Sequence, residues 1–472
     1  MTDVEMKYID GLFERAKAAQ AIYATFTQAQ LDKAARACAK AIFDHAEMFA
    51  KEDFEETGMG RYESKVKRNL DGPKAQWYYT KDKKSTGIIG WEKGKLDQDC
   101  IIKIAKPVGI VAGVSPVTNP VQNMASNGMQ ALKCGNAIIF CPHPRAKNVS
   151  NHAAAVIREE LVKVGAPADI VQITEEPSIE FTGEVMRRAD VIVATGGPGM
   201  VYAAAATGTP SMGVGQGNCQ VVIDDGMSDK FDDIAAGILA SRTYDGGILC
   251  SCEQSIFVPE KDQDAILKAF DENGAYILND EAAADRLREI LFIDRDGRRA
   301  PNPQYVGLTA QEIGRGIGII VPENKAAIMV VVKNYAEKEA LCREKLCPVI
   351  ALYPYGGDFK EAVAMAKANL LMEGAGHSSD VYSNHKDNQI YAGLELPVCR
   401  LVVNNNNFFV GGGQYNTGMV PTSGIGCGFW GKNAIRENLN YEHLLNYTRM
   451  IFTVDGVMAP TDEEIWAEDS YK

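Results

Sequence analysis

The sequence predicts an α/β fold with two doubly wound domains and a small β arm. A chain of 472 residues is longer than one hydrophobic core normally serves. Short β-branched segments alternate with helical patterns from residue 108 to 245 and again from 256 to 403, which is typical of parallel sheets covered on both faces. Two extended segments, 86–91 and 99–105, stand apart from this alternation and predict a strand pair that leaves the main body.

Composition limits the function classes. Hydrophobic residues make up 46% and charged residues 24%, as in globular proteins, and the net charge of -13 argues against nucleic acid as a partner. The first residues are acidic and no apolar run reaches spanning length, so we expect no membrane partner and a cytoplasmic location. The eleven cysteines include no C-x-x-C pair, so neither disulfides nor a metal site is indicated, and the compartment is expected to be reducing.

The chain begins with two predicted packing helices within residues 6–49. Ile9, Leu12 and Phe13 recur at helical spacing, and Thr27 with Gln30 forms a capping box before the second helix. We expect no chemistry in these helices.

The first alternation predicts a nucleotide-binding domain. The expected strands and helices are listed here in chain order: strands at 110–114, 137–140, 170–173, 191–194 and 220–223, helices at 151–164 and 186–189. One strand ends in the turn V-A-T-G-G-P-G (193–199) before a helix at 200–206. The backbone amides of this turn, which holds Thr195, Gly196, Gly197 and Gly199, are suited to bind a pyrophosphate. A plain glycine-rich turn is the alternative, because the spacing is not G-x-G-x-x-G.

The second alternation predicts a second α/β domain. Helices are expected at 263–270 and 359–371, strands at 327–332 and 401–403, and a polar loop at 404–407. We assign residues 1–84 and 106–243 to the nucleotide-binding domain, 244–435 to a domain that carries the reactive thiol, and 85–105 with 436–472 to an oligomerisation arm and tail. An extended segment at 448–454 is expected to return to the early strand pair, which suggests a homodimer or a dimer of dimers.

Cys250 is the strongest catalytic candidate. It lies in Y-D-G-G-I-L-C-S-C-E-Q-S (244–255), where Gly246 and Gly247 let the backbone turn tightly. The thiol falls near the joint between the two predicted domains, where clefts form. A thiolate attacks carbonyl carbon and leaves well, which suits acyl chemistry. The alternative, a small buried hydrophobic residue, applies more strongly to Cys252.

Six ordered motifs resemble the CoA-acylating aldehyde dehydrogenases. They are V-S-P-V-T-N-P (114–120), A-T-G-G-P-G (194–199), G-V-G-Q-G-N (213–218), D-G-G-I-L-C-S-C-E-Q-S (245–255), E-K-L-C-P-V (344–349) and E-G-A-G-H (373–377). This group includes CoA-dependent succinate semialdehyde dehydrogenases and one half of bifunctional aldehyde-alcohol dehydrogenases. The likeness covers nearly the whole chain and implies an aldehyde dehydrogenase-like fold.

The resemblance implies a role for each matching residue. Cys250 would form a thiohemiacetal and then a thioester. Asn119 would donate to the developing oxyanion; a cap or turn residue beside Pro120 is its alternative. Glu344 would hold the ribose of NAD or NADP, with a surface glutamate before a strand as the alternative. His377 would help coenzyme A to bind or to lose its thiol proton, with an ordinary packing histidine as the alternative.

Gly213 departs from the hydrolytic members of the superfamily. Those enzymes place a glutamate base within an E-L-G-G-K run, and the aligned position here is Gly213, which we group with the cofactor-binding residues. Without that base water is poorly activated, so the acyl group is expected to pass to the thiol of coenzyme A.

The sequence leaves the ligands partly open. Arg145 or Lys147 is a candidate for contact with the 2′-phosphate of NADP. Ser115 and Arg242 are candidates to line the aldehyde pocket, with a surface role as the alternative for Arg242. Succinate semialdehyde is favoured, with acetaldehyde and sulfoacetaldehyde as alternatives. A hydrolytic aldehyde dehydrogenase, a nicotinamide-independent Cys-His acyltransferase and a catalytically silent scaffold are the rival functions.

Overall fold

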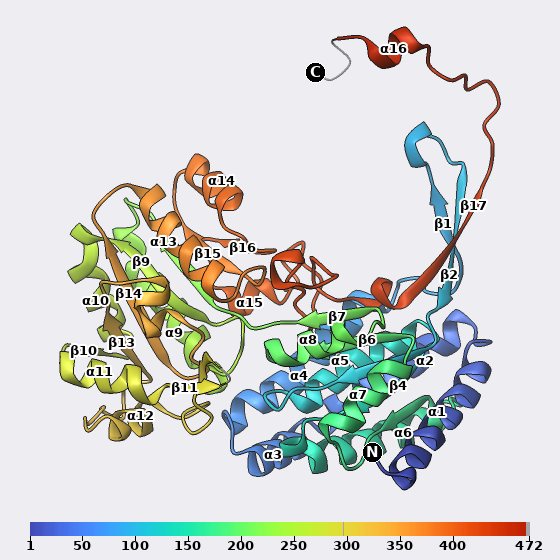
Figure 1. The fold of residues 1–472 in the computed structure, drawn as a ribbon, viewed down its shortest axis with the longest axis horizontal. Helices are drawn as coiled ribbons and strands as arrows, with labels where there is room; N and C mark the ends of the chain where they lie inside the picture. Colours follow the sequence, from blue (N-terminus) through green and yellow to red (C-terminus); the bar gives the residue numbers. More distant parts are fainter. Residues whose placement is uncertain (296, 469–472) are drawn as a thin grey trace.

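The computed structural model describes residues 1–295 and 297–468. Two α/β bodies lie side by side, and a three-stranded ribbon leaves the first of them (Figure 1). The two parallel sheets and the ribbon confirm the predicted fold class.

The first body contains a five-stranded parallel sheet in the order β5-β4-β3-β6-β7. Its strands are β3 (Ile110–Val114), β4 (Ala137–Cys141), β5 (Val171–Ile173), β6 (Val191–Thr195) and β7 (Ser211–Val214). The strand order reverses between β3 and β6, so the crevice outside their carboxyl ends is the expected ligand position of a doubly wound sheet.

Eight helices precede or connect these strands. They are α1 (Asp3–Tyr23), α2 (Gln28–Asp44), α3 (Ala46–Thr57), α4 (Tyr62–Thr80), α5 (Pro120–Lys133), α6 (Lys147–Lys163), α7 (Ile179–Arg188) and α8 (Pro198–Ala206). The predicted capping box of Thr27 and Gln30 is present at α2. The helix expected at 186–189 is the end of the longer α7.

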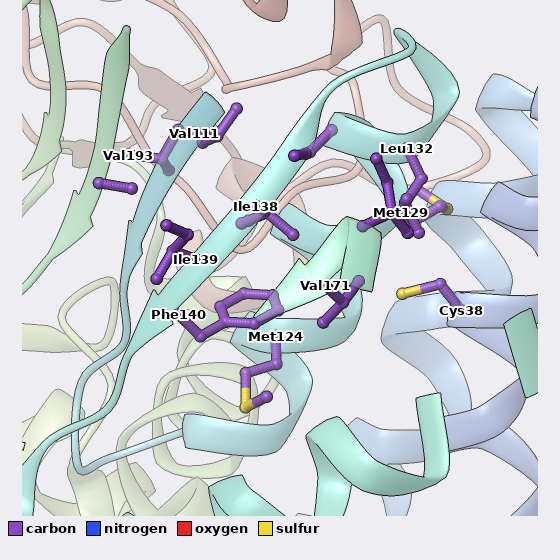
Figure 2. Packing of buried hydrophobic residues seen from close by; sticks show 14 of the residues in the cluster. Cys38, Val111, Met124, Met129, Leu132, Ile138, Ile139, Phe140, Val171 and Val193 are labelled. Atoms are coloured by element: carbon purple, nitrogen blue, oxygen red, sulfur yellow. The ribbon is translucent and has the colours of Figure 1, made fainter. Parts of the chain in front are cut away.

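The core of the first body forms where α5 packs between its sheet and α2. Figure 2 shows Phe140 of β4 beside Met124 of α5, with Cys38 of α2 pointing toward the same helix. A Cβ on Gly128 would lie 2.9 Å from the Cys38 sulfur, so a glycine is needed for this close packing.

The second body contains a seven-stranded parallel sheet in the order β10-β13-β14-β9-β8-β15-β16. Its strands are β8 (Cys219–Ile223), β9 (Glu253–Pro259), β10 (Ala275–Leu278), β13 (Ala327–Val331), β14 (Val349–Tyr355), β15 (Ser379–Tyr382) and β16 (Leu401–Val403). Its helices are α9 (Phe231–Thr243), α10 (Gln263–Glu272), α11 (Glu281–Ile290), α12 (Ala310–Gly316), α13 (Phe359–Met372), α14 (Lys386–Glu395) and α15 (Asn407–Gly411). The hairpin β11 (Phe292–Arg295) and β12 (Arg298–Pro301) stands apart from this sheet.

Two assignments from the sequence need correction. The segment 220–223 was grouped with the first sheet, but β8 belongs to the second, so the chain changes sheets between β7 and β8. The alternation of apolar and helical segments predicts where a strand lies. It does not predict which strand lies next to it in a sheet. The expected polar loop at 404–407 ends in a buried residue, because Asn407 begins α15 and its backbone N–H donates to Glu253 Oε1 at 2.8 Å.

The ribbon consists of β1 (Gly87–Glu92), β2 (Ile101–Pro107) and β17 (Leu445–Ile451), all antiparallel. The predicted return of the C-terminal segment to the early strand pair is therefore confirmed. A short helix, α16 (Asp462–Trp466), follows it. Within residues 1–295 and 297–468, no helix combines the length and the apolar character needed to cross a membrane.

Candidate active site

One cavity of about 2500 Å³ lies between the two sheets. On one side it is lined by segments that follow strands of the first sheet, at 115–119, 141–145, 195–199 and 214–216. On the other side it is lined by segments that precede strands of the second sheet, at 248–251 and 343–344. The carboxyl edge of one sheet thus faces the amino edge of the other, and the predicted residues Cys250, Asn119, Ser115, Thr195, Gly196, Gly197, Gly199 and Glu344 all line the cavity.

The loop that carries Cys250 is fixed from the first body. Asp245 has a φ of 51°, a left-handed conformation that costs energy for a residue with a side chain. Its carboxylate accepts a hydrogen bond from the Arg61 backbone N–H at 2.6 Å and forms an ion pair with the partly buried Arg68. Tyr244 donates to the Ser64 carbonyl at 2.8 Å. Sequence reasoning missed this anchoring by α4, although an aspartate before two glycines was a visible signal for a turn.

The Cys250 side chain is partly exposed to the cavity. Burial and then the nearby Glu344 carboxylate raise the pKa of its thiol well above the usual value. The thiol is therefore protonated at neutral pH in the ligand-free protein. Cys252 is fully buried and its thiol contacts the Ser241 carbonyl at 3.0 Å, which fits a packing role.

Gly217 packs against the Cys250 loop, and its backbone N–H is hydrogen-bonded to the Glu344 carboxyl group. A Cβ on Gly217 would lie 1.8 Å from the Cys250 carbonyl oxygen, so only glycine fits there. Burial, followed by the charge of Glu373, raises the pKa of Glu344 to about 8, although the Gly217 N–H and the Gln216 side chain favour the charged form. At pH 7 this carboxyl group is mostly protonated. Gln216 also lines the cavity and was not predicted from the sequence.

Asn119 occupies the N-cap position of α5, yet its side chain does not cap that helix. Its Nδ2 donates to Gln122 Oε1 at 3.2 Å, and the residue lines the cavity. Asn119 therefore does not act as a helix cap. Its amide can donate to a ligand oxygen by giving up the hydrogen bond to Gln122.

The glycine turn presents open backbone to the cavity. Gly197 is the N-cap of α8, no side chain caps this helix, and a Cβ on Gly197 or Gly199 would meet no atom within 4 Å. The Thr195 hydroxyl accepts a hydrogen bond from Asn123 Nδ2 at 3.2 Å, which fixes the start of the turn. Free amides at a helix N-terminus favour an anion, so the turn fits the pyrophosphate of a dinucleotide.

Residues 1–282 match the aldehyde dehydrogenase family. The chain is 44% identical to the acetylating succinate-semialdehyde dehydrogenase of Clostridium kluyveri, over 97% of this chain and 98% of that protein. This chain belongs to the aldehyde dehydrogenase family. It is also 37% identical to the bifunctional aldehyde-alcohol dehydrogenase of Escherichia coli, over 93% of this chain and 48% of that protein. The structure of an acetylating aldehyde dehydrogenase from Geobacillus thermoglucosidasius superposes with a TM-score of 0.90 at 32% identity, covering 98% of this chain and all of that one.

These relatives confirm the resemblance to acylating members of the family. The E. coli relative is about twice as long, so this aldehyde dehydrogenase corresponds to one part of it.

In this aldehyde dehydrogenase Arg242 does not reach the cavity. It is fully buried, Nη2 donates to the Cys347 carbonyl, and Nη1 donates to the Gly247 carbonyl at 3.4 Å. The expected contact with the aldehyde is thus corrected, because the guanidinium instead joins the Cys250 loop to the segment before β14. Ser115 does line the cavity, but it is buried and its hydroxyl donates to Asn123 Oδ1 at 3.1 Å.

His377 lies behind the cavity wall formed by Gly374 and Ala375 and does not line it. Burial and the neighbouring Arg400 lower its pKa to about 3, so the imidazole is neutral. Its Nδ1 is 2.8 Å from the Ser378 hydroxyl, and its Nε2 has no hydrogen-bond partner among the described residues. A role toward coenzyme A requires this region to rearrange.

Gly213 also lies off the cavity wall. A Cβ there would lie 2.9 Å from Val201 Cγ1, so a glutamate would fit only if Val201 moved. Of the two basic candidates for NADP, Arg145 lines the cavity and donates to the Thr57 carbonyl at 2.8 Å. Lys147 is paired with Glu176 at 2.6 Å and is not part of the wall.

Proposed function

We propose that this aldehyde dehydrogenase oxidises a short aldehyde, with succinate semialdehyde favoured, to the acyl-CoA thioester with NAD or NADP and coenzyme A. The observation that carries the proposal is that one cavity is lined by the Cys250 thiol, the Asn119 amide and the open turn at Gly197. A Cys-His acyltransferase has less support, because His377 stands behind the wall of that cavity.

The chemistry begins with the Cys250 sulfur. The thiol gives up its proton to water as the sulfur bonds to the aldehyde carbon. The carbonyl π bond breaks, and its oxygen takes the negative charge of a thiohemiacetal. Asn119 Nδ2 and the Cys250 backbone N–H are the donors for that oxygen, a stabilisation typically worth about 10²–10³ in rate per donor. A dinucleotide whose pyrophosphate is held by the turn at Gly197 would supply its nicotinamide as the hydride acceptor. Loss of hydride from the bound carbon leaves a thioester on Cys250.

The second half of the reaction is an exchange between two thioesters. The sulfur of coenzyme A attacks the acyl carbon, and the Cys250 sulfur leaves and regains a proton. Two features disfavour water as the competing nucleophile: residue 213 is a glycine, and Glu344 is mostly protonated at pH 7. A protonated carboxyl group cannot accept a proton from water.

The choice of aldehyde follows the relatives. The C. kluyveri protein is named for succinate semialdehyde at 44% identity, whereas a sulfoacetaldehyde dehydrogenase from an Acholeplasma species is 35% identical. Comparing kcat/KM for acetaldehyde, butyraldehyde, succinate semialdehyde and sulfoacetaldehyde tests the choice. We expect succinate semialdehyde to give the highest value and succinyl-CoA as product. A higher value for another aldehyde would reassign the substrate.

We propose that the ribbon joins two copies of the chain. Ile88, Trp91 and Ile451 expose more than half of their side-chain surface on β1 and β17. Exposed apolar groups gathered on one ribbon are typical of an interaction surface. Sedimentation equilibrium is expected to show a dimer or a dimer of dimers. The cytoplasmic location stays a prediction from the sequence.

A further inference from the structure

The β11–β12 hairpin brings three arginines to the cavity that contains Cys250. Arg295, Arg298 and Arg299 are exposed and line this cavity. Figure 1 shows β11 on the side of the second body that faces α3 and α4. The chain as a whole carries a net charge of -13, so this local excess of positive charge is not a reflection of composition.

Two of these arginines stand directly opposite each other. The antiparallel register pairs Arg295 with Arg298, and like charges at opposed positions destabilise a strand pair. Residue 296, which separates them in the sequence, is an aspartate outside the described residues; within residues 1–295 and 297–468 neither arginine is ion-paired with a carboxylate. Arg299 instead faces Asp294, whose carboxylate accepts a hydrogen bond from the Gly297 N–H at 2.9 Å. An anion between Arg295 and Arg298 would remove this repulsion.

The position of the pair indicates what kind of anion it takes. The cavity volume of about 2500 Å³ exceeds what a small ligand fills and suits coenzymes. A short aldehyde must place its carbonyl at Cys250, which is only partly exposed, whereas both arginines are exposed. A phosphate on a long coenzyme can reach the exposed hairpin while the reactive end lies at the thiol. Planar guanidinium groups match phosphate oxygens in pairs.

We propose that Arg295 and Arg298 bind the ribose phosphate of an adenosine coenzyme, either the 3′-phosphate of coenzyme A or the 2′-phosphate of NADP. This inference rests on the proposed function, which brings both coenzymes into the cavity. It assigns the hairpin a role in coenzyme specificity, while the chemistry stays at Cys250.

The test is calorimetric titration of the full chain with four coenzymes: coenzyme A, 3′-dephospho-coenzyme A, NADP and NAD. The variant carries Arg295→Gln with Arg298→Gln. We expect the Kd of this variant to rise about 10-fold for coenzyme A or for NADP. The Kd for 3′-dephospho-coenzyme A and for NAD, which lack the ribose phosphate, should stay unchanged. Selective loss for coenzyme A identifies the 3′-phosphate as the ligand, and selective loss for NADP identifies the 2′-phosphate.

A control variant removes the same charge elsewhere. Arg36→Gln with Arg315→Gln changes two exposed arginines that do not line the cavity, and all four affinities are expected to stay as in the unaltered protein. In the hairpin variant, affinities for all four coenzymes that stay as in the unaltered protein, or fall equally for all four, would overturn the proposal. Because binding is measured directly, failure of thioester formation in a separate assay would count against the proposed function and not against the hairpin site.

Discussion

The two edges that face each other across the cavity are built differently. The first-sheet edge is open backbone: the turn at Gly197 has no side-chain cap and free space around it. The second-sheet edge consists of buried side chains that are held by internal hydrogen bonds. Arg242 donates to two backbone carbonyls, and Glu253 accepts a hydrogen bond from the Asn407 backbone N–H. The first edge is shaped to receive a ligand, and the second is organised before any ligand arrives. Changes at the first edge should therefore alter affinity, and changes at the second should alter rate or stability.

The largest effect is expected at the thiol itself. Cys250→Ala should lower the CoA-dependent reduction of NAD(P) by about 10⁴-fold or more, since the covalent route is lost. Cys252→Ala is the matched control and should keep most of the activity, because that thiol is buried away from the cavity. Steady-state assays with succinate semialdehyde measure both. Retained turnover in Cys250→Ala would place the nucleophile elsewhere.

Arg242→Met tests whether the second edge is structural. Losing the guanidinium leaves the Gly247 and Cys347 carbonyls without this donor, at a cost of about 2 kcal/mol in the free energy of unfolding. Urea denaturation measures that loss. The ratio of kcat/KM between succinate semialdehyde and butyraldehyde should not change. A selective loss of activity on the charged aldehyde with normal stability would restore Arg242 as a substrate contact.

Gly197→Asp tests whether the first edge receives an anion. An aspartate at this N-cap should stabilise α8 by about 0.5–1 kcal/mol while its charge repels the pyrophosphate. The KM for the dinucleotide should rise about 10-fold, with melting temperature unchanged or higher. Gly197→Ser adds a cap without charge and should raise KM less. An unchanged KM in the aspartate variant would contradict dinucleotide binding at this turn.

The last prediction concerns stability alone and is a pH dependence at Glu344. Its pKa is about 8 in the folded protein against an ordinary 4.5, so the folded state holds a proton that the unfolded chain releases earlier. The resulting stability is complete below about pH 4.5 and is lost as the pH rises through about 8. Glu344→Gln cannot titrate, so its advantage in unfolding free energy over the unaltered protein should grow across that range.

Denaturation at the two ends of this range gives the comparison. Glu289→Gln, an exposed substitution on α11, should show no such growth. A pH-independent difference for Glu344→Gln would mean that this carboxyl group has an ordinary pKa.

The helices, strands and reactive motifs could be predicted from the sequence, because each depends on residues that are close together in the chain. Periodicity located the strands, and glycine patterns located the turns at Gly197 and before Cys250. Sequence reasoning misassigned β8 to the first sheet, because strand pairing depends on contacts far apart in the chain. It expected Arg242 in the pocket, because a positive charge near a catalytic loop looks the same whether it faces a ligand or a backbone carbonyl. The anchoring of Asp245 by Arg68 joins residues 177 positions apart and has no local signal.

The most direct test of the central claim is to omit coenzyme A. If the acyl group waits on Cys250 because no base activates water, rapid mixing of enzyme, aldehyde and NAD(P) should give one burst of NAD(P)H, equal to the amount of enzyme. Addition of coenzyme A should then restore steady turnover. Sustained formation of the free acid without coenzyme A would contradict the account.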